Sequence, residues 1–96
     1  MTPYEEMANA IIQKQTLVLG ETITSDIVSR VDGLTLKEDR SVSITAEDAC
    51  DVIERLVAQF RGLLGAAAVL FARDAAALII KENVGLQVPL SLRGAA

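Results

Sequence analysis

The feature that most constrains this chain is a long apolar stretch in its second half. From residue 66 to residue 80, only Arg73 and Asp74 are polar. A run of this length suggests a transmembrane helix, but two charged residues near its middle would be costly in lipid. A helix that is apolar on nearly all sides packs against neighbours on several sides. The sequence therefore predicts the central, buried helix of a fold that does not associate with a membrane.

Arg73 and Asp74 allow two interpretations within such a helix. A buried charge must be matched by a partner, so the pair could form ion pairs across a subunit interface or with the first half of the chain, for instance Arg73 with Asp26. Alternatively, they share one side of the helix with Ala77 and Lys81 and form a narrow solvent-exposed stripe. The helical spacing favours the stripe.

The amino-acid composition excludes several classes of site. The 96 residues include no histidine and a single cysteine, so the chain lacks the most common general base and metal ligand and cannot form an internal disulfide. Thirteen acidic residues outnumber nine scattered basic ones, and the aromatic residues are one tyrosine and two phenylalanines. We therefore expect no cofactor, no metal and no nucleic-acid partner. The lone cysteine fits a reducing compartment, so we expect a cytoplasmic protein.

The first half of the chain predicts two helices followed by a hairpin. Thr2 and Glu5 have the spacing of a capping box, which predicts a helix over about residues 3–15. Apolar residues four apart predict a second helix over about residues 21–31. Polar and apolar residues then alternate in two short runs on either side of polar residues 37–40. This pattern is typical of a β-hairpin, although an extended loop would show it too.

The second half predicts another helix and a bend before the apolar helix. Thr45 is a candidate N-cap, and Glu47 and Asp48 would lie in the first turn of an amphipathic helix. Gly62 and Gly65 then indicate a bend.

Residues 86–92 alternate strictly between apolar and other residues, which predicts a strand, and Pro89 would place that strand at a sheet edge. The whole pattern predicts one mostly helical α+β domain over residues 1–96. It consists of two helix–bend–helix units with short extended segments, over residues 2–44 and 45–92.

The two units suggest an internal duplication. Aligning Leu19-Gly20 with Leu64-Gly65 gives an offset of 45 residues and matches several apolar positions. Because any two helix–bend–helix units share such features, the same pattern also fits two unrelated units.

Association is the function that the sequence favours, because the chain has much aliphatic surface and no reactive set of side chains. We expect a non-enzymatic homodimer or small oligomer with a regulatory, adaptor or scaffold role. The candidate interface residues come from the amphipathic helix, the apolar helix and the last extended segment: Val52, Leu56, Phe60, Phe71, Arg73, Asp74, Leu86, Val88 and Leu90.

Two alternatives remain open. A small, acidic, aliphatic dimer would also suit a chaperone-like binder of an apolar peptide. Cys50 lies in the first turn of the expected amphipathic helix, where a thiol can be activated, so a small enzyme or redox protein is the third possibility. With no histidine as a base and with acidic neighbours, a small core residue is the favoured interpretation of Cys50.

Overall fold

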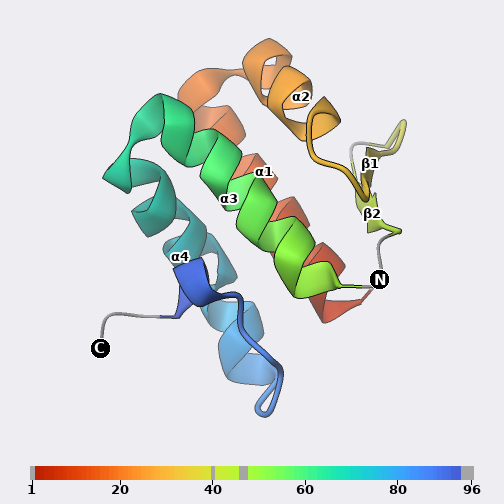
Figure 1. Cartoon of the computed structure of the whole chain (residues 1–96), viewed down its shortest axis with the longest axis vertical. Helices are drawn as coiled ribbons and strands as arrows, with labels where there is room; N and C mark the ends of the chain where they lie inside the picture. The colour runs from red at the N-terminus through yellow and green to blue at the C-terminus, as the bar shows by residue number, and fades with distance from the viewer. Residues whose placement is uncertain (1, 40, 46–47, 94–96) are drawn as a thin grey trace.

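The computed structural model describes residues 2–39, 41–45 and 48–93. Within these residues the chain forms four α-helices, a two-stranded hairpin and a 3₁₀ turn (Figure 1). In chain order they are α1 (Pro3–Leu19), α2 (Glu21–Ser29), β1 (Leu34–Leu36), β2 (Val42–Ile44), α3 (Ala49–Leu64), α4 (Ala66–Glu82) and the 3₁₀ turn η1 (Leu90–Leu92). This is the mostly helical α+β fold that the sequence predicts.

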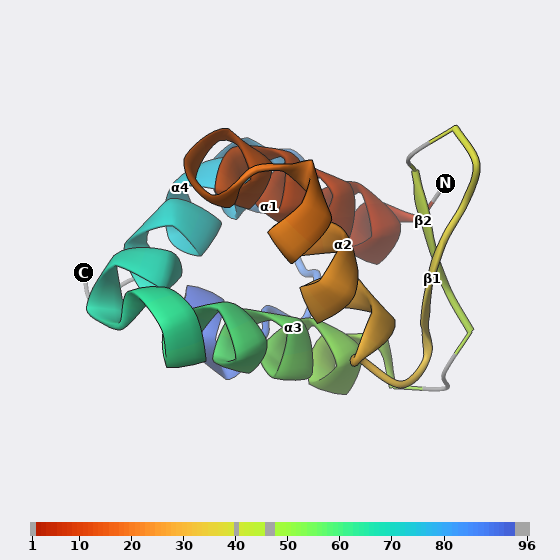
Figure 2. The ribbon, with the colours of Figure 1, turned by 90° about the horizontal axis from the view of Figure 1, so that it is seen from above.

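The three long helices surround the core, and the shorter elements close one side of it. Figure 2 shows α1 and α3 on opposite sides of the core, with α4 on a third side and α2 on the fourth. α1 packs mainly against α4, and α3 packs against both. The hairpin lies beyond α2, on the side of the molecule away from α4 (Figure 1).

The core is filled mainly by aliphatic side chains of α1 and α3. Met7 and Ile11 of α1 and Leu56 and Phe60 of α3 are fully buried. Both helices repeat apolar residues at spacings of three and four, so each presents one continuous apolar side to the core. These two helices supply most of the large buried side chains.

The position of α4 differs from the predicted central helix. α4 turns Ala68, Ala72 and Ala76 toward the core, and all three are fully buried. Leu70 and Leu78 lie on its other side and are 60% and 64% exposed. Small alanine side chains let α4 approach its neighbours closely, while a core already filled from α1 and α3 leaves no room for the leucines. The prediction is wrong because apolar composition alone does not say which side of a helix is buried.

Gly20 and Gly65 form the two helix corners. The chain passes from α1 to α2 at Gly20 (φ 83°, ψ 166°) and from α3 to α4 at Gly65 (φ 64°, ψ −145°). This backbone region is accessible essentially only to glycine. The N–H of each glycine also closes the preceding helix, with N···O distances of 2.8 Å to Thr16 and Arg61. The predicted bends are confirmed at these two glycines, whereas Gly62 lies inside α3.

The structure does not confirm the internal duplication. α2 has 9 residues and α4 has 17. The first pair of helices is followed by a hairpin, and the second by irregular chain and η1. The match of Leu19-Gly20 with Leu64-Gly65 reflects two helix corners of the same kind.

The start of α3 also differs from the prediction. Asp48, not Thr45, is the N-cap, and its side chain accepts the N–H of Asp51 at 3.2 Å. Thr45 instead extends the hairpin, because its N–H donates to the carbonyl oxygen of Gly33 at 2.8 Å. Glu47 lies outside the described residues. Threonine and aspartate both cap helices well, so the sequence did not separate the two positions.

Residues 86–92 do not form the predicted strand. The segment is irregular up to Pro89 and then forms η1. A strand needs a neighbouring strand, and the hairpin lies apart from this segment (Figure 1). The alternation of apolar residues has another cause, because Leu86, Val88 and Leu92 all pack against the core.

The predicted hairpin is confirmed, and α1 covers one of its edges. β1 and β2 are antiparallel, with Leu34 opposite Ile44. The N–H of Val42 donates to Oδ1 of Asn9 at 2.9 Å. The N–H of Ile44 donates to Oε2 of Glu5, also at 2.9 Å. Glu5 uses its other carboxylate oxygen in the predicted capping box, which is also confirmed, so one side chain starts α1 and holds β2.

We expect Gly65→Ala to destabilise the fold by about 1–3 kcal/mol, because alanine rarely adopts the backbone conformation of this corner. A Cβ here would meet no atom within 4 Å, so the cost comes from the backbone alone. Gly62→Ala is the matched control: its Cβ also has open space, and inside a helix it should stabilise the fold by about 0.5–1 kcal/mol. Urea denaturation measures both values, and a Gly65→Ala variant as stable as wild type would contradict the corner geometry.

We expect part of the stability to be lost in acid through Glu5. Hydrogen bonds from the backbone N–H groups of Thr2 and Ile44 favour the charged form and lower the pKa of Glu5 below its ordinary value of 4.5. A carboxylate with a lowered pKa stabilises the fold above that ordinary value, and the contribution is lost as the pH falls through the lowered pKa. Glu5→Gln should therefore lose less stability than wild type between about pH 6 and about pH 3.

Glu6→Gln, in the same turn but exposed, is the control for this measurement and should behave as wild type. Asp39 contributes to the loss of stability in acid in all three proteins, because hydrogen bonds from the hydroxyl and N–H of Ser41 lower the pKa of Asp39. Equal pH dependence of Glu5→Gln and wild type in urea denaturation would show that Glu5 does not hold the hairpin as described.

Candidate functional site

Three of the predicted interface residues belong to the core. Val52, Leu56 and Phe60 of α3 are fully buried and pack within the hydrophobic cluster of the same chain. The sequence identified this apolar side of α3, but the structure places it inside the chain. These residues therefore offer no surface to a partner.

Arg73 and Asp74 each bind a different element of the chain. Asp74 forms an ion pair with Lys14 of α1 at 2.9 Å. Arg73 is half-buried, and its Nε donates to the carbonyl oxygen of Ser91 in η1 at 3.1 Å. The suggested pair between Arg73 and Asp26 is not formed, because Asp26 pairs at 2.5 Å with the arginine four residues after it. Of the two neighbouring charges on α4, Asp74 is exposed and Arg73 holds the last segment in place.

The last segment is divided between core and surface. Leu86 and Val88 are half-buried and pack against the core, whereas Leu90 is 71% exposed. Glu54 of α3 anchors this segment, because its carboxylate accepts both the N–H and the hydroxyl of Ser91, the latter at 2.7 Å. Among the three predicted interface residues here, Leu90 has the large exposed side chain.

α4 carries an exposed side that faces away from the core. Its residues follow one another at helical spacings of four, three and one and all are exposed: Leu70, Asp74, Ala77 and Leu78. We call these four residues the outer face of α4. Phe71 lies next to it and is half-buried. Asp74 and Phe71 are among the predicted interface residues, whereas Leu70 and Leu78 are not.

A signal for the two missed leucines is present in the sequence. Ala68, Ala72 and Ala76 recur every four residues, which marks one side of the helix as suited to close packing. Leu70 and Leu78 each follow one of these alanines by two positions, about 200° around the helix. A helix buried on its alanine side therefore exposes these leucines.

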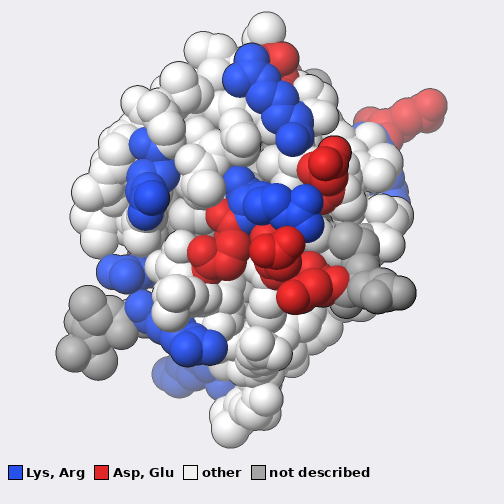
Figure 3. All heavy atoms as spheres, in the orientation of Figure 1, with Lys and Arg blue, Asp and Glu red and all other residues white. Residues whose placement is uncertain are grey.

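α3 presents a different kind of surface to solvent. Figure 3 shows acidic and basic side chains next to one another in the middle of the face that α3 occupies in Figure 1. On α3, Asp51 and Arg55 form an ion pair at 2.7 Å, as expected for residues four apart. This is an ordinary solvated helix surface, whereas the outer face of α4 combines apolar residues with one ion-paired carboxylate.

Tyr4 and Cys50 hold the chain that follows α4. The hydroxyl of Tyr4 donates to the carbonyl oxygen of Gln87 at 2.7 Å, and the thiol of Cys50 donates to the same oxygen at 3.2 Å. Burial, followed by the hydrogen bond with Cys50, raises the pKa of Tyr4 to about 12. Neither the hydroxyl of Tyr4 nor the carbonyl oxygen of Gln87 is a base for the thiol of Cys50. These contacts therefore give Cys50 a packing role between α1, α3 and the last segment.

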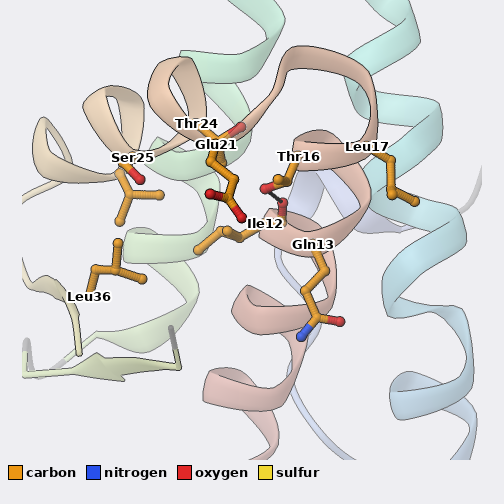
Figure 4. A pocket seen from close by; sticks show the side chains of 9 residues that line it. Ile12, Gln13, Thr16, Leu17, Glu21, Thr24, Ser25 and Leu36 are labelled. Carbon is orange, nitrogen blue, oxygen red and sulfur yellow. Dashed lines mark hydrogen bonds between the residues drawn. The ribbon is translucent and has the colours of Figure 1, made fainter. Parts of the chain in front are cut away.

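A groove lies between α1, α2 and β1 (Figure 4). Its volume is about 290 Å³, at the lower end of the range for small-molecule sites. Its lining combines apolar side chains with side chains that carry oxygen: Ile12, Thr16, Glu21, Thr24, Val28 and Leu36. The sequence gives no sign of this groove, because its residues come from three elements and share no motif.

Two kinds of site are not found in the part of the chain that the structure describes. No group of three histidine, cysteine, aspartate or glutamate side chains there is placed to hold a metal ion. None of the helices described has the length and apolar character needed to cross a membrane.

Comparisons of the chain with protein-family models, curated proteins and solved structures give no match. The function is therefore argued from the geometry described above.

We expect tyrosine absorbance to report the burial of Tyr4 and its hydrogen bond with Cys50, because Tyr4 is the one tyrosine of the chain. In the folded protein Tyr4 should ionise near pH 12, against an ordinary pKa of 10.0. Because the folded pKa is raised, the ionisation of Tyr4 destabilises the fold: Tyr4 leaves the stability unchanged below about pH 10, and the stability falls as the pH rises toward 12. Cys50→Ala should lower the midpoint without restoring the ordinary value, since burial is the larger cause. An ordinary midpoint in the folded wild type would contradict the geometry.

Proposed function

We propose that this protein is a non-enzymatic association module, and that two copies meet through the outer face of α4. The observation that carries the proposal is the exposure of Leu70 and Leu78, at 60% and 64%, on the most apolar helix of the chain. Single exposed leucines are common on protein surfaces, but two on one side of a helix form a strip that a partner can cover.

The charge of Asp74 on this face is balanced. Asp74 is paired with Lys14 at 2.9 Å, and Lys81, exposed on the same side of α4, lies beyond Leu78 at the end of the strip. Ala77 has a small side chain, so the side chains of Leu70 and Leu78 protrude furthest from the strip. In a symmetric dimer the same patch of both copies meets, so unpaired like charges would face each other, and the ion pair within each copy reduces that cost.

The expected dimer is weak. Burying a leucine side chain completely contributes about 1.5–3 kcal/mol, so four leucines that are each about 60% exposed would contribute roughly 4–7 kcal/mol. Association costs about 4 kcal/mol or more in lost freedom of motion. One copy has an accessible surface of 5609 Å², close to the roughly 5,300 Å² of a compact monomer of this size, so we expect it to fold without a partner. We therefore expect a dimer that dissociates on dilution.

A contact that depends on concentration suits a regulatory, adaptor or scaffold role. Cys50 is an unpaired thiol, which fits a reducing compartment, so we propose a cytoplasmic location.

Sedimentation velocity from about 5 μM to about 500 μM tests this proposal. The mass of the wild type should rise with concentration, whereas Leu70→Glu/Leu78→Glu should remain a monomer. Leu63→Glu/Val84→Glu is the matched control, because its positions are 57% and 94% exposed but lie outside the outer face of α4.

The control should associate as wild type does. A wild type that stays monomeric at the highest concentration, or a control that loses association equally, would overturn the proposal. Both double variants change exposed positions, so their far-ultraviolet circular dichroism should match that of the wild type.

A further inference from the structure

Three arginines surround η1. Nε of Arg73, on α4, donates to the carbonyl oxygen of Ser91 at 3.1 Å, and Arg93 follows η1 directly. Arg61 lies in the last turn of α3, two turns after Glu54 and on the same side of that helix. Glu54 binds the N–H and the hydroxyl of Ser91, so this side of α3 faces η1. We call Arg61, Arg73 and Arg93 the arginine patch.

The arginine patch has no ion pair with a carboxylate of the described residues. The ion pairs found there belong to other cations, namely Lys14, Arg30 and Arg55. Figure 3 shows basic side chains at the lower left, over α4 and η1, with no acidic side chain among them, whereas acidic side chains gather over α3. The unpaired positive charge around η1 contrasts with the net charge of −4 of the whole chain.

The guanidinium groups of Arg73 and Arg93 are held in place and still have donors to offer. Nε of Arg93 donates to the carbonyl oxygen of Val88 at 3.1 Å, as Nε of Arg73 does to that of Ser91. A guanidinium has five N–H donors, and Nε supplies only one of them. A side chain already held through Nε loses less conformational freedom when its Nη groups bind a carboxylate.

Leu90 adds an apolar contact beside these arginines. Its side chain is 71% exposed, and the N–H of Arg93 donates to its carbonyl oxygen at 3.2 Å. In a 3₁₀ turn, residues three apart lie on the same side, so Leu90 and Arg93 are neighbours on the surface. The surface around η1 therefore combines unpaired positive charge with a protruding leucine.

We propose that the arginine patch and Leu90 bind an acidic segment of a partner protein that also carries leucine or a similar apolar residue. Arginine binds carboxylates through paired hydrogen bonds. The three arginines come from different parts of the chain, so they match several spaced carboxylates and not a single small anion. The proposal does not rest on the dimer, because none of these residues belongs to the outer face of α4.

A nucleic acid and an anionic membrane match this surface less well. Single-stranded nucleic acid stacks its bases on aromatic side chains. Phe60 is fully buried and Phe71 is half-buried, so neither offers an open ring. A bilayer is wide, so it would also meet the acidic side chains over α3 that Figure 3 shows near the basic ones. A short acidic segment can contact the arginine patch alone.

Titration of the ¹⁵N-labelled wild type with the peptide Ac-EELEELEE-NH₂, followed by NMR, tests the proposal. Shifts should change first at the amides of Leu90, Ser91 and Arg93. Ac-QQLQQLQQ-NH₂ keeps the leucines without the charges and should bind at least about tenfold more weakly. Ac-EEAEEAEE-NH₂ keeps the charges without the leucines and should bind about three- to tenfold more weakly.

Arg61→Glu/Arg93→Glu should weaken binding of Ac-EELEELEE-NH₂ at least about tenfold, because each change removes an attraction and adds a repulsion. Arg30→Glu/Lys37→Glu is the matched control, since it changes the net charge equally at exposed positions outside the patch. It should bind within about threefold of the wild type, because salt screens distant charges. Arg61→Gln removes one charge and should weaken binding about two- to fivefold.

The proposal is wrong if millimolar Ac-EELEELEE-NH₂ shifts no amide around η1, if the glutamine peptide binds equally, or if the matched control loses as much binding as Arg61→Glu/Arg93→Glu. Tighter binding of an oligothymidine or of phosphatidylserine vesicles would replace the acidic segment by a nucleic acid or a membrane. Leu70→Ala/Leu78→Ala removes much of the proposed dimer surface without adding charge and should bind the peptide as wild type does. A failure of the dimer therefore leaves this test intact.

Discussion

α4 packs onto α1 and α3 through Ala68, Ala72 and Ala76, whose side chains are single methyl groups. Gln15 of α1 is fully buried at this contact, and its Nε2 donates to the carbonyl oxygen of Ala68 at 3.1 Å. A helix held by its small side must turn its large side to solvent. The most apolar helix of the chain therefore builds surface as well as core, and this surface is the basis of the proposed association.

Local structure was predictable at most positions where the signal is local, and the N-cap of α3 is the exception. The capping box of Glu5, the corner at Gly20 and the pairing of Asp51 with Arg55 each depend on residues within one or two turns, and the structure shows all three. The hairpin was predictable from its alternating pattern. Its attachment to α1 was not, because the hydrogen bond from Ile44 to Glu5 joins residues 39 positions apart.

The errors at α4, on the apolar side of α3 and at residues 86–92 share one physical cause, which is that burial depends on what the rest of the chain supplies. Residues 86–92 alternate as a strand does, but no edge of the hairpin is near enough to pair with them, so the alternation serves packing against α3 and α4. The apolar side of α3 was recognised, yet its partner is the chain's own core. The groove between α1, α2 and β1 could not be predicted, because its lining residues come from three elements and share no motif.

The most direct test of this packing compares leucines on the two sides of the core. Leu56→Ala removes a fully buried side chain and should cost about 2–5 kcal/mol. Leu70→Ala and Leu78→Ala should each cost about 0.5 kcal/mol or less in urea denaturation at low micromolar concentration, where we expect a monomer. If Leu70→Ala cost as much as Leu56→Ala, α4 would be buried on the side assigned to solvent, and the association surface would not exist.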